Sequence, residues 1–303
     1  MFKYYTTKGD VKMSDPKKQH FVPQTYLSFF KDNSGYVHIY DKVKDEFRKQ
    51  TPANTGYSKH FYTVETNGEK DFFIEKALAV KVDVLYNPLI EKINKEEIFN
   101  NEDKRNLGLF LACQYLRTPA QRKNHNSMIE TTFKKITKIT YGLKKHHGVL
   151  TDSMNNPEME SFVENEEYTV DVPKEHSLEL LMNFADEMGN MLSKQNIIII
   201  KASHKSEFIS SDNPYSMVKE EWVQKWEGFG VINTVKIFPL TPKHVLVLKD
   251  VGEKMIYIQH FSRDKVRELN FQIANWSDRF LFSNNELLLK GFVQKIKKRS
   301  IKK

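Results

Sequence analysis

Two polar residues in an otherwise apolar helical stretch are the first candidates for chemistry. Gln114 and Arg117 close the stretch 107–117, and on a helical wheel they share an arc with leucine and phenylalanine side chains. A buried polar group needs a partner, because an unpaired amide costs about 1–3 kcal/mol and an unpaired charge costs more. The two residues lie three positions apart, so both can reach one target. They predict a catalytic clamp for a phosphate or carboxylate, and an ion pair that supports the fold is the alternative.

His20 is the second candidate, because it stands just before a predicted helix start. Pro23 is tolerated in the first turn of a helix, so a short helix is expected to run from there to near Phe30. A histidine at such a turn can move a proton near neutral pH. Gln24 lies on the adjoining side of the helix and is expected to contact the substrate. The alternative for His20 is a capping or exposed side chain.

Carboxylates supply the remaining candidates. A short apolar strand runs into Asp212 and Asn213 and stops at a proline, which predicts that Asp212 faces a cleft and that Asn213 binds substrate. Turn formation by the two side chains is the alternative. Glu75 lies among apolar residues at a helix start, where a carboxylate also stabilises the helix dipole. Asp212 and Glu75 are oxygen ligands that could together hold a divalent metal such as Mg²⁺.

The charge is unevenly spread along the chain. The 303 residues contain 47 Lys plus Arg and 39 Asp plus Glu, a formal net charge of +8. Residues 295–303 carry only basic charges, including Lys297, Lys298 and Arg299. Such a segment neutralises phosphates, so these residues are expected to contact RNA or DNA, with a solvated terminus as the alternative. Residues 152–187, by contrast, are strongly acidic.

Composition and missing motifs exclude several classes. No apolar run approaches the roughly 18 residues needed to span a membrane, and the opening residues do not resemble a signal peptide. Cys113 is the only cysteine, which excludes an intramolecular disulfide and a cysteine-based zinc site. The chain contains neither a phosphate-binding loop nor a dinucleotide fingerprint nor a nucleophile elbow. We therefore expect a cytoplasmic protein with no membrane partner.

The elements that must position these residues follow from hydrophobic periodicity. Strands are predicted at 36–40, 46–50, 61–64, 196–200, 208–210, 231–238, 245–248 and 255–258. Helices are predicted at 71–95, with an interruption near Pro88, and at 101–117, 120–143, 177–193, 262–276 and 290–298. The pattern predicts an α+β fold with a mixed N-terminal hairpin region, a helical middle and a β-rich C-terminal half with a largely antiparallel sheet. We expect a flexible arm at 1–17, a single domain at 18–290 with a mobile acidic connection at about 148–173, and a basic tail at 291–303.

Six short blocks occur in order along the chain: His20 to Leu27, His60 to Val64, Phe110 to Pro119, Phe208 to Pro214, Phe238 to Pro242 and Asp278 to Ser283. In this order they resemble a bacterial family of the DUF4238 type, a domain of unknown function, over residues 18 to about 285. Asn270 also matches the family pattern, whereas Cys113 stands where a small apolar residue is expected. Some relatives occur among phage-defence genes, which implies a toxic effector, often a nuclease. The resemblance also implies that the six candidate residues within these blocks act together, namely His20, Gln24, Gln114, Arg117, Asp212 and Asn213.

The resulting hypothesis is a phage-defence nuclease that cleaves RNA or DNA phosphodiesters. His20 would move a proton, Arg117 and Gln114 would hold the phosphate, and Asp212 would orient His20 or bind a metal with Glu75. A non-enzymatic sensor or nucleic-acid-binding defence protein is one alternative, and an enzyme acting on a small nucleotide is another. The sequence leaves the substrate, the trigger and the oligomeric state open.

Overall fold

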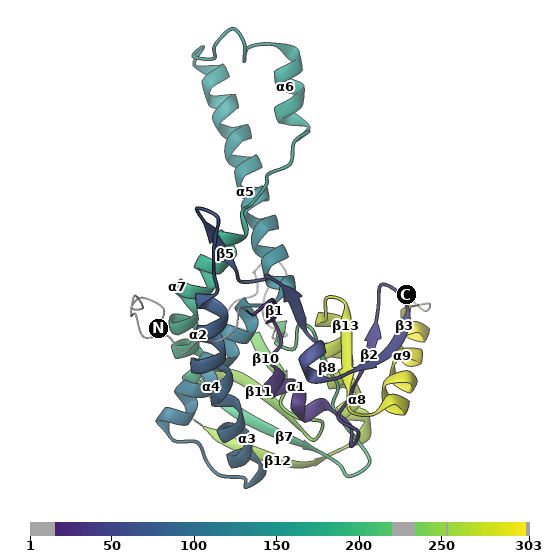
Figure 1. Ribbon diagram of the computed structural model, residues 1–303. Helices are drawn as coiled ribbons and strands as arrows, with labels where there is room; N and C mark the ends of the chain where they lie inside the picture. The colour runs from purple at the N-terminus through teal and green to yellow at the C-terminus, as the bar shows by residue number, and fades with distance from the viewer. Residues whose placement is uncertain (1–15, 220–233, 253, 301–303) are drawn as a thin grey trace. The chain divides into compact units, whose positions relative to one another are not determined.

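The computed structural model describes residues 16–219, 234–252 and 254–300. It divides the chain into two compact units, one of residues 1–119 with 180–303 and one of residues 120–179. All of the sheets lie in the first unit (Figure 1). The strands are β1 (Lys18–His20), β2 (Val37–Asp41), β3 (Glu46–Gln50), β4 (Tyr57–Lys59), β5 (Val64–Thr66), β6 (Glu69–Asp71), β7 (Gln195–Ala202), β8 (Ser210–Ser211), β9 (Ser216–Lys219), β10 (Thr234–Pro239), β11 (His244–Val251), β12 (Met255–Phe261) and β13 (Phe280–Ser283).

The helices fall mainly in the middle of the chain. The α-helices are α1 (Gln24–Leu27), α2 (Phe73–Lys81), α3 (Tyr86–Asn94), α4 (Asn101–Leu116), α5 (Pro119–His146), α6 (Pro157–Glu164), α7 (Lys174–Ser193), α8 (Arg263–Trp276) and α9 (Glu286–Ser300). Short 3₁₀ turns lie at Ser28–Phe30, Pro52–Asn54 and Asp83–Leu85. No helix among the described residues combines the length and the apolar character that crossing a bilayer requires.

The larger sheet has the strand order β12-β7-β11-β10-β9. The isoleucine run of β7 lies inside it, where β-branched side chains pack well on both faces. β7 pairs antiparallel with β11 and parallel with β12, and the other pairs are antiparallel. The acid-rich connection from α5 therefore leads, through α7, directly into an interior strand of this sheet.

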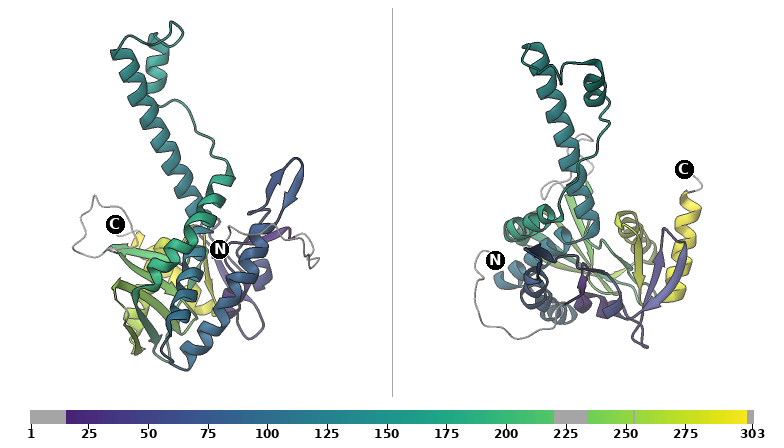
Figure 2. Two further views of the ribbon diagram at one scale, coloured as in Figure 1. Left: turned by 90° about the vertical axis from the view of Figure 1, so that its left-hand side faces the viewer. Right: turned by 45° about the horizontal axis from the view of Figure 1, so that its top comes forward.

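The smaller sheet has the order β3-β2-β13-β8 and joins residues far apart in the chain. β13 pairs with β2 on one side and with β8 on the other, both antiparallel. Helix α9 packs against β2 and β13 (Figure 2). Buried side chains from both sheets, α8 and α9 form one hydrophobic cluster, which includes Ile200, Phe271, Leu281 and Phe292.

The predicted α+β class with mostly antiparallel sheets is confirmed, and most elements lie where periodicity placed them. Two details differ. The helix expected over 71–95 is interrupted by the turn Asp83–Leu85 and not at Pro88, because Pro88 lies in the first turn of α3, where a proline is tolerated. The strand expected at 61–64 starts only at Val64, because the backbone at Phe61 and Tyr62 turns instead of pairing.

The expected domain boundaries can be set beside these elements. The acidic connection at 148–173 contains α6. The residues expected to form a basic tail belong to α9 as far as Ser300, and 301–303 lie outside the described residues. Nearly all of the arm expected at 1–17 also lies outside them. The single domain expected over 18–290 includes the unit of residues 120–179.

Candidate active site

His20 ends β1 and lies buried at the turn that leads into α1, with 7% of its surface exposed. Its ring packs against Tyr57, with 5.6 Å between ring centroids. The Nε2 atom of Gln24 lies 3.4 Å from Nδ1 of His20. Nε2 of His20 is shielded from solvent and has no hydrogen-bond partner within the described part of the chain. One nitrogen of a buried imidazole therefore has no partner among the described residues.

Gln114 and Arg117 come from the end of α4 and are both buried, as their helical positions predicted. Nε and Nη2 of Arg117 donate to Oε1 of Gln114 at 3.1 and 2.9 Å, and Nη1 donates to Oδ1 of Asp83 at 2.9 Å. Burial raises the pKa of Asp83, and the charge of Arg117 opposes that rise. Each nitrogen of the guanidinium thus has a protein partner. In this arrangement Arg117 holds elements together and is no open clamp for an anion.

The α4 terminus is joined to the His20 turn by further hydrogen bonds. Nε2 of Gln114 donates to the carbonyl of Phe21 at 3.0 Å. The hydroxyl of Tyr62 lies 3.3 Å from the carbonyl of His20 and 3.2 Å from that of Arg117. The blocks around His20, Tyr62 and Arg117, distant in sequence, therefore meet in one buried cluster.

Glu75 in α2 completes this cluster. Its Oε1 accepts a hydrogen bond of 3.4 Å from the backbone N–H of His20. Burial raises the pKa of Glu75 to about 7, although the His20 N–H and the charge of Arg117 oppose the rise. Burial also lowers the pKa of His20 to about 4, against the effect of the Ala53 carbonyl. Near neutral pH the imidazole of His20 is therefore neutral, and the carboxyl group that binds its backbone N–H is close to half protonated.

A surface cavity adjoins the cluster through Gln24. The cavity has a volume of about 500 Å³, within the range of small-ligand sites. Amide and hydroxyl side chains dominate its lining, among them Thr25, Ser28, Asn87 and Asn94, and Glu91 is the only charged residue among the described residues that line it. This lining suits a neutral polar group that needs several hydrogen bonds.

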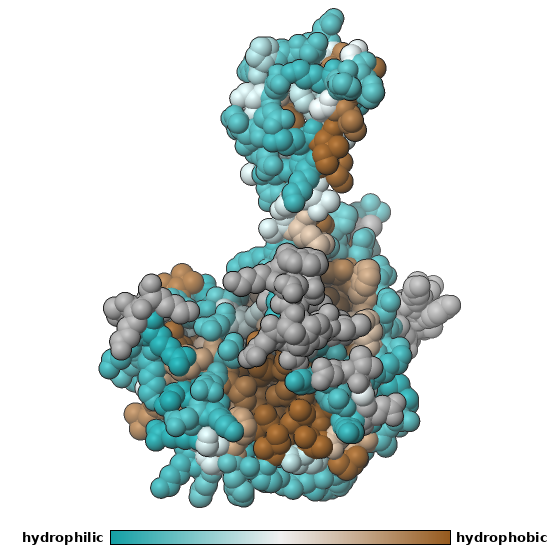
Figure 3. Space-filling model, turned by 180° about the vertical axis from the view of Figure 1, so that it is seen from behind, coloured by the Kyte–Doolittle hydropathy of each residue, from teal (hydrophilic) through white to brown (hydrophobic). Residues whose placement is uncertain are grey.

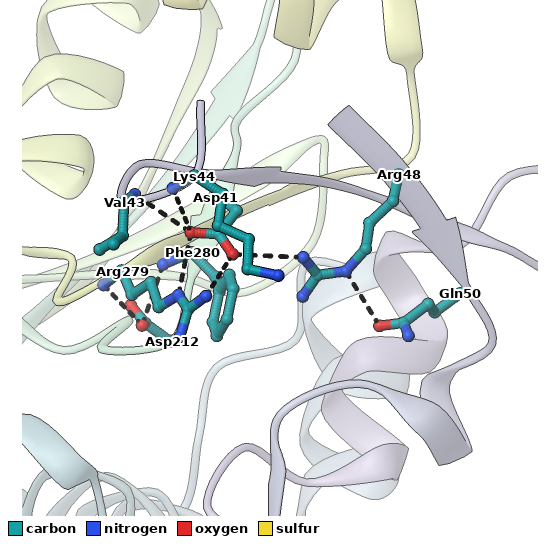
Figure 4. A network of polar contacts seen from close by, with 8 residues as sticks. All are labelled: Asp41, Val43, Lys44, Arg48, Gln50, Asp212, Arg279 and Phe280. Atoms are coloured by element: carbon teal, nitrogen blue, oxygen red, sulfur yellow. Dashed lines mark hydrogen bonds and ion pairs between the residues drawn. The ribbon is translucent and has the colours of Figure 1, made fainter. Parts of the chain in front are cut away.

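Asp212 does not join this cluster, which corrects the expectation that it orients His20. Its carboxylate accepts three backbone N–H bonds of 2.7–3.0 Å, from Asp278, Arg279 and Phe280. Figure 4 shows the bonds from Arg279 and Phe280. Burial nevertheless raises the pKa of Asp212 to about 6. The carboxylate thus fixes the backbone at the start of β13. Turn and backbone chemistry, the alternative considered above, describes this residue better than catalysis.

Asn213 contacts Thr118, the residue that follows Arg117. Its Nδ2 donates to the carbonyl of Trp276 at 3.0 Å, and its Oδ1 accepts a hydrogen bond of 3.4 Å from the hydroxyl of Thr118. Both ends of the Asn213 amide thus have protein partners, and the substrate contact expected of it stays a prediction.

The metal site expected from Glu75 and Asp212 does not form. Glu75 faces the His20 backbone, whereas both oxygens of Asp212 accept backbone N–H bonds near β13. Within the described ranges no three His, Cys, Asp or Glu side chains are grouped closely enough to hold an ion. The residues therefore do not fit the Mg²⁺ role.

The three basic residues chosen near the C-terminus differ in their surroundings. Nζ of Lys297 lies 2.5 and 2.7 Å from the carboxylate oxygens of Asp45, and the Arg299 guanidinium lies 3.7 Å from the ring centroid of Phe271. Lys298 is exposed. A cavity of about 350 Å³ beside α9 is lined by further cationic side chains, namely Lys205, Arg263, Arg267 and Lys295.

Several residues of the cluster were not found by sequence reasoning. Asp83 is a charged residue in an apolar helical stretch, as Arg117 is. This common feature of the two residues could have predicted that they form an ion pair.

The ion pair between Asp41 and Arg279 was also not predicted. It is bidentate, with hydrogen bonds of 2.9 and 2.7 Å, and it holds the pKa of Asp41 well below its usual range (Figure 4). Nothing local in the sequence indicates a contact across so many residues.

Comparison with known proteins gives one match. Residues 18–286 match the model of a family described as a protein of unknown function, DUF4238. No curated protein and no solved structure matches the chain.

Proposed function

We propose that this chain, which belongs to the DUF4238 family, is a phage-defence effector that cleaves RNA or DNA phosphodiesters by acid–base catalysis. One observation carries the proposal: His20 has a buried neutral imidazole with an unpartnered nitrogen, and its backbone N–H donates to a carboxyl group with a pKa of about 7. Perturbed titration of paired groups is typical of catalytic sites. A cytoplasmic location is part of the proposal, because both substrates occur there.

His20 and Glu75 would divide the proton transfers. In the tautomer with its proton on Nδ1, which requires the Gln24 amide to turn its oxygen toward the ring, Nε2 of His20 takes a proton from the attacking water or ribose hydroxyl as its oxygen bonds to phosphorus. Glu75 in its protonated form gives a proton to the leaving oxygen as the phosphorus–oxygen bond breaks. An anionic substrate would raise the low pKa of His20 towards the working range, because a negative charge favours the imidazolium.

The other residues would position the substrate. Gln24 reaches the 500 Å³ cavity, whose amides suit the edges of a nucleobase. Gln114 and Arg117 would hold the His20 turn in place through Phe21. Lys298 and the cations around the 350 Å³ cavity would attract the polyanion without reading its sequence.

A cleavage assay with matched histidine variants tests this proposal. Purified full chain would be incubated with structured RNA, single- and double-stranded DNA, and small nucleotides. We expect cleavage of a polynucleotide that falls at least ~100-fold in His20→Gln and in Glu75→Gln. His244→Gln is the control, because His244 is equally buried and also has its pKa lowered to about 4 but pairs with Thr241 instead.

Two outcomes would contradict the proposal. One is an intact set of polynucleotides after incubation with wild-type protein. The other is equal activity of the wild type and His20→Gln. Turnover of small nucleotides without cleavage of any polynucleotide would instead support an enzyme that acts on small nucleotides.

A non-enzymatic nucleic-acid-binding protein is the second candidate, favoured by the saturated contacts of Arg117 and Asp212. Side chains whose polar atoms all bind other protein groups stabilise the fold, but they have no free atom with which to bind a substrate. For such a protein His20→Gln should leave RNA binding and defence in cells unchanged. The assay above and a binding titration of the same variant separate the two candidates.

A further inference from the structure

Helix α5 exposes a series of large apolar side chains. Met128, Phe133, Ile136, Ile139 and Leu143 are 60%, 52%, 58%, 63% and 56% exposed. Figure 3 shows apolar side chains along one side of this unit, at the top of the view. Single exposed apolar residues are ordinary, but a contiguous row on one helix marks an interaction surface.

The spacing of the row identifies the kind of surface. Ile129, Thr132, Ile136, Ile139 and Leu143 follow one another at intervals of three, four, three and four residues. This is the 3.5-residue repeat that keeps one seam of a helix facing another helix. Met128 and Phe133 flank the seam. The helix has 28 residues, long enough to present the whole row.

The neighbouring α6 segment occupies a different face of α5. The hydroxyl of Tyr141 donates to the carbonyl of Met154 at 3.0 Å, and Lys138 and Lys145 pair with Glu164 and Glu160 at 2.6 and 2.5 Å. These three positions of α5 alternate with the apolar row. Helix α6 therefore leaves the seam uncovered.

We propose that the seam of α5, defined by Ile129, Thr132, Ile136, Ile139 and Leu143, binds the same seam of a second copy in antiparallel orientation. From Thr132 to Leu143 the intervals of four, three and four residues read the same from either end, so Ile136 would face the partner's Ile139, and Thr132 the partner's Leu143. A self-complementary patch of this kind is what a two-fold dimer requires. The inference is independent of the proposed catalysis.

The exposed area suits a reversible dimer. A large apolar side chain has on the order of 150–200 Å² of surface. Five apolar side chains of α5 are more than half exposed, namely Met128, Phe133, Ile136, Ile139 and Leu143. Together they would bury about 1,000 Å² between two copies, which is the lower limit for a specific interface. We therefore expect dissociation in the micromolar range.

Charge distinguishes this partner and orientation from others. A parallel pair would place the basic ends of two helices, each with Lys144, side by side, and an antiparallel pair separates them. A membrane-bound helix needs free cations along its polar face. Here Lys138 and Lys145 already pair with glutamates, and Lys134 lies 3.1 Å from Glu130. A second copy fits this face better than an anionic bilayer does.

Sedimentation of the full chain over a range of concentrations tests the proposal. We expect a monomer–dimer equilibrium in the wild type, and a dissociation constant at least ~100-fold higher in the double variant Ile136→Glu with Ile139→Glu. Leu287→Glu, at a position 82% exposed on α9, is the control and should dimerise as the wild type does. Circular dichroism checks that the exposed substitutions leave the fold intact.

Cysteine cross-linking tests the orientation, since the native Cys113 is buried. Thr132→Cys protein mixed with Leu143→Cys protein should form a mixed disulfide dimer, and neither variant alone should cross-link efficiently. A wild type that stays monomeric at ~100 µM, or cross-linking of Thr132→Cys with itself, would overturn the proposal. The proposal would also be overturned if the monomer bound anionic phosphatidylserine vesicles and the double glutamate variant did not. In that case the seam would be a membrane-binding surface.

Discussion

At the scale of single residues, the central feature is a buried polar cluster in which each group constrains its neighbours. Arg117 connects Gln114 and Asp83, and Gln114 in turn holds the backbone beside His20. The burial of Gln114 and Arg117 could be predicted from their places on an apolar helix. Their partners could not, because Asp83 lies 34 positions from Arg117 and no local pattern links them.

Removing Arg117 should therefore be costly. Arg117→Met leaves Asp83 buried without its cation, and we expect a loss of about 3–5 kcal/mol in the free energy of unfolding. Adding Asp83→Leu should recover part of that loss, because no charge then stays buried. Urea denaturation measures both variants. Arg267→Ala, which breaks the more exposed pair with Asp264, is the control and should cost under ~1 kcal/mol.

Glu75 should make stability depend on pH. Its pKa is about 7 in the folded chain against 4.5 as the ordinary value, so the folded state binds the extra proton. The unfolding free energy should fall as pH rises from about 4.5 to 7, by roughly 1–3 kcal/mol after allowance for partial exposure. Urea denaturation at pH 5 and pH 8 measures it. Glu75→Gln should remove this component, and an identical pH dependence in both proteins would contradict the assignment.

Asp212 should prove structural and not catalytic. In Asp212→Asn an amide N–H₂ would face backbone N–H groups that now bind a carboxylate, so we expect a loss of about 1–3 kcal/mol in stability. Activity per folded molecule should stay within a few-fold of the wild type. A stable variant with activity lost ~100-fold would restore Asp212 to the catalytic site.

At the scale of elements, helix α4 is held at both ends and in the middle. Asn100 caps its first turn in a reciprocal capping box with Asp103, and Asp103 also accepts from Lys92 of α3 at 2.7 Å. Periodicity predicted the bounds of α4 almost to the residue, because a cap and Pro119 delimit it. The turn at Asp83–Leu85 was not predicted, because the apolar spacing continues through it.

The contact of α4 with α7 depends on two glycines. A Cβ atom at Gly108 would lie 2.2 Å from the carbonyl oxygen of Gly189, and one at Gly189 would lie 3.0 Å from the backbone of Leu109. Gly108→Ala should thus separate the helices and lower the unfolding free energy by more than ~2 kcal/mol. Gly291→Ala on α9 is the matched control. It meets nothing within 4 Å and should be neutral or stabilising by up to ~1 kcal/mol in thermal denaturation.

At the scale of the whole molecule, the net charge of +8 has structural consequences. The sequence suggested that basic residues near the C-terminus attract nucleic acid, but Lys297 is paired with Asp45. The cations of the 350 Å³ cavity come from three separate segments, so only the fold brings them together. The net charge could thus be predicted from the sequence, but the positions at which the charges gather on the surface could not.

Nucleic-acid binding should depend on these cations and on salt. We expect Lys205→Ala with Arg263→Ala and Lys295→Ala to weaken binding of single-stranded RNA and to reduce the slope of log affinity against log salt by about 2. Fluorescence anisotropy at several salt concentrations measures this. Alanine at the exposed Lys44, Lys70 and Lys254 removes equal charge and is the control. Equal slopes for the two triple variants would contradict a localised binding face.

The position of β13 also has a consequence for biosynthesis. Its four residues lie between β2 and β8, so the last strand of this sheet to be synthesised fills a gap between two that are synthesised before it. A nascent chain whose β13 is still in the ribosomal tunnel cannot close this sheet, and its hydrophobic cluster lacks α9. If the protein harms its own cell, it can do so only after β13 and α9 have been synthesised.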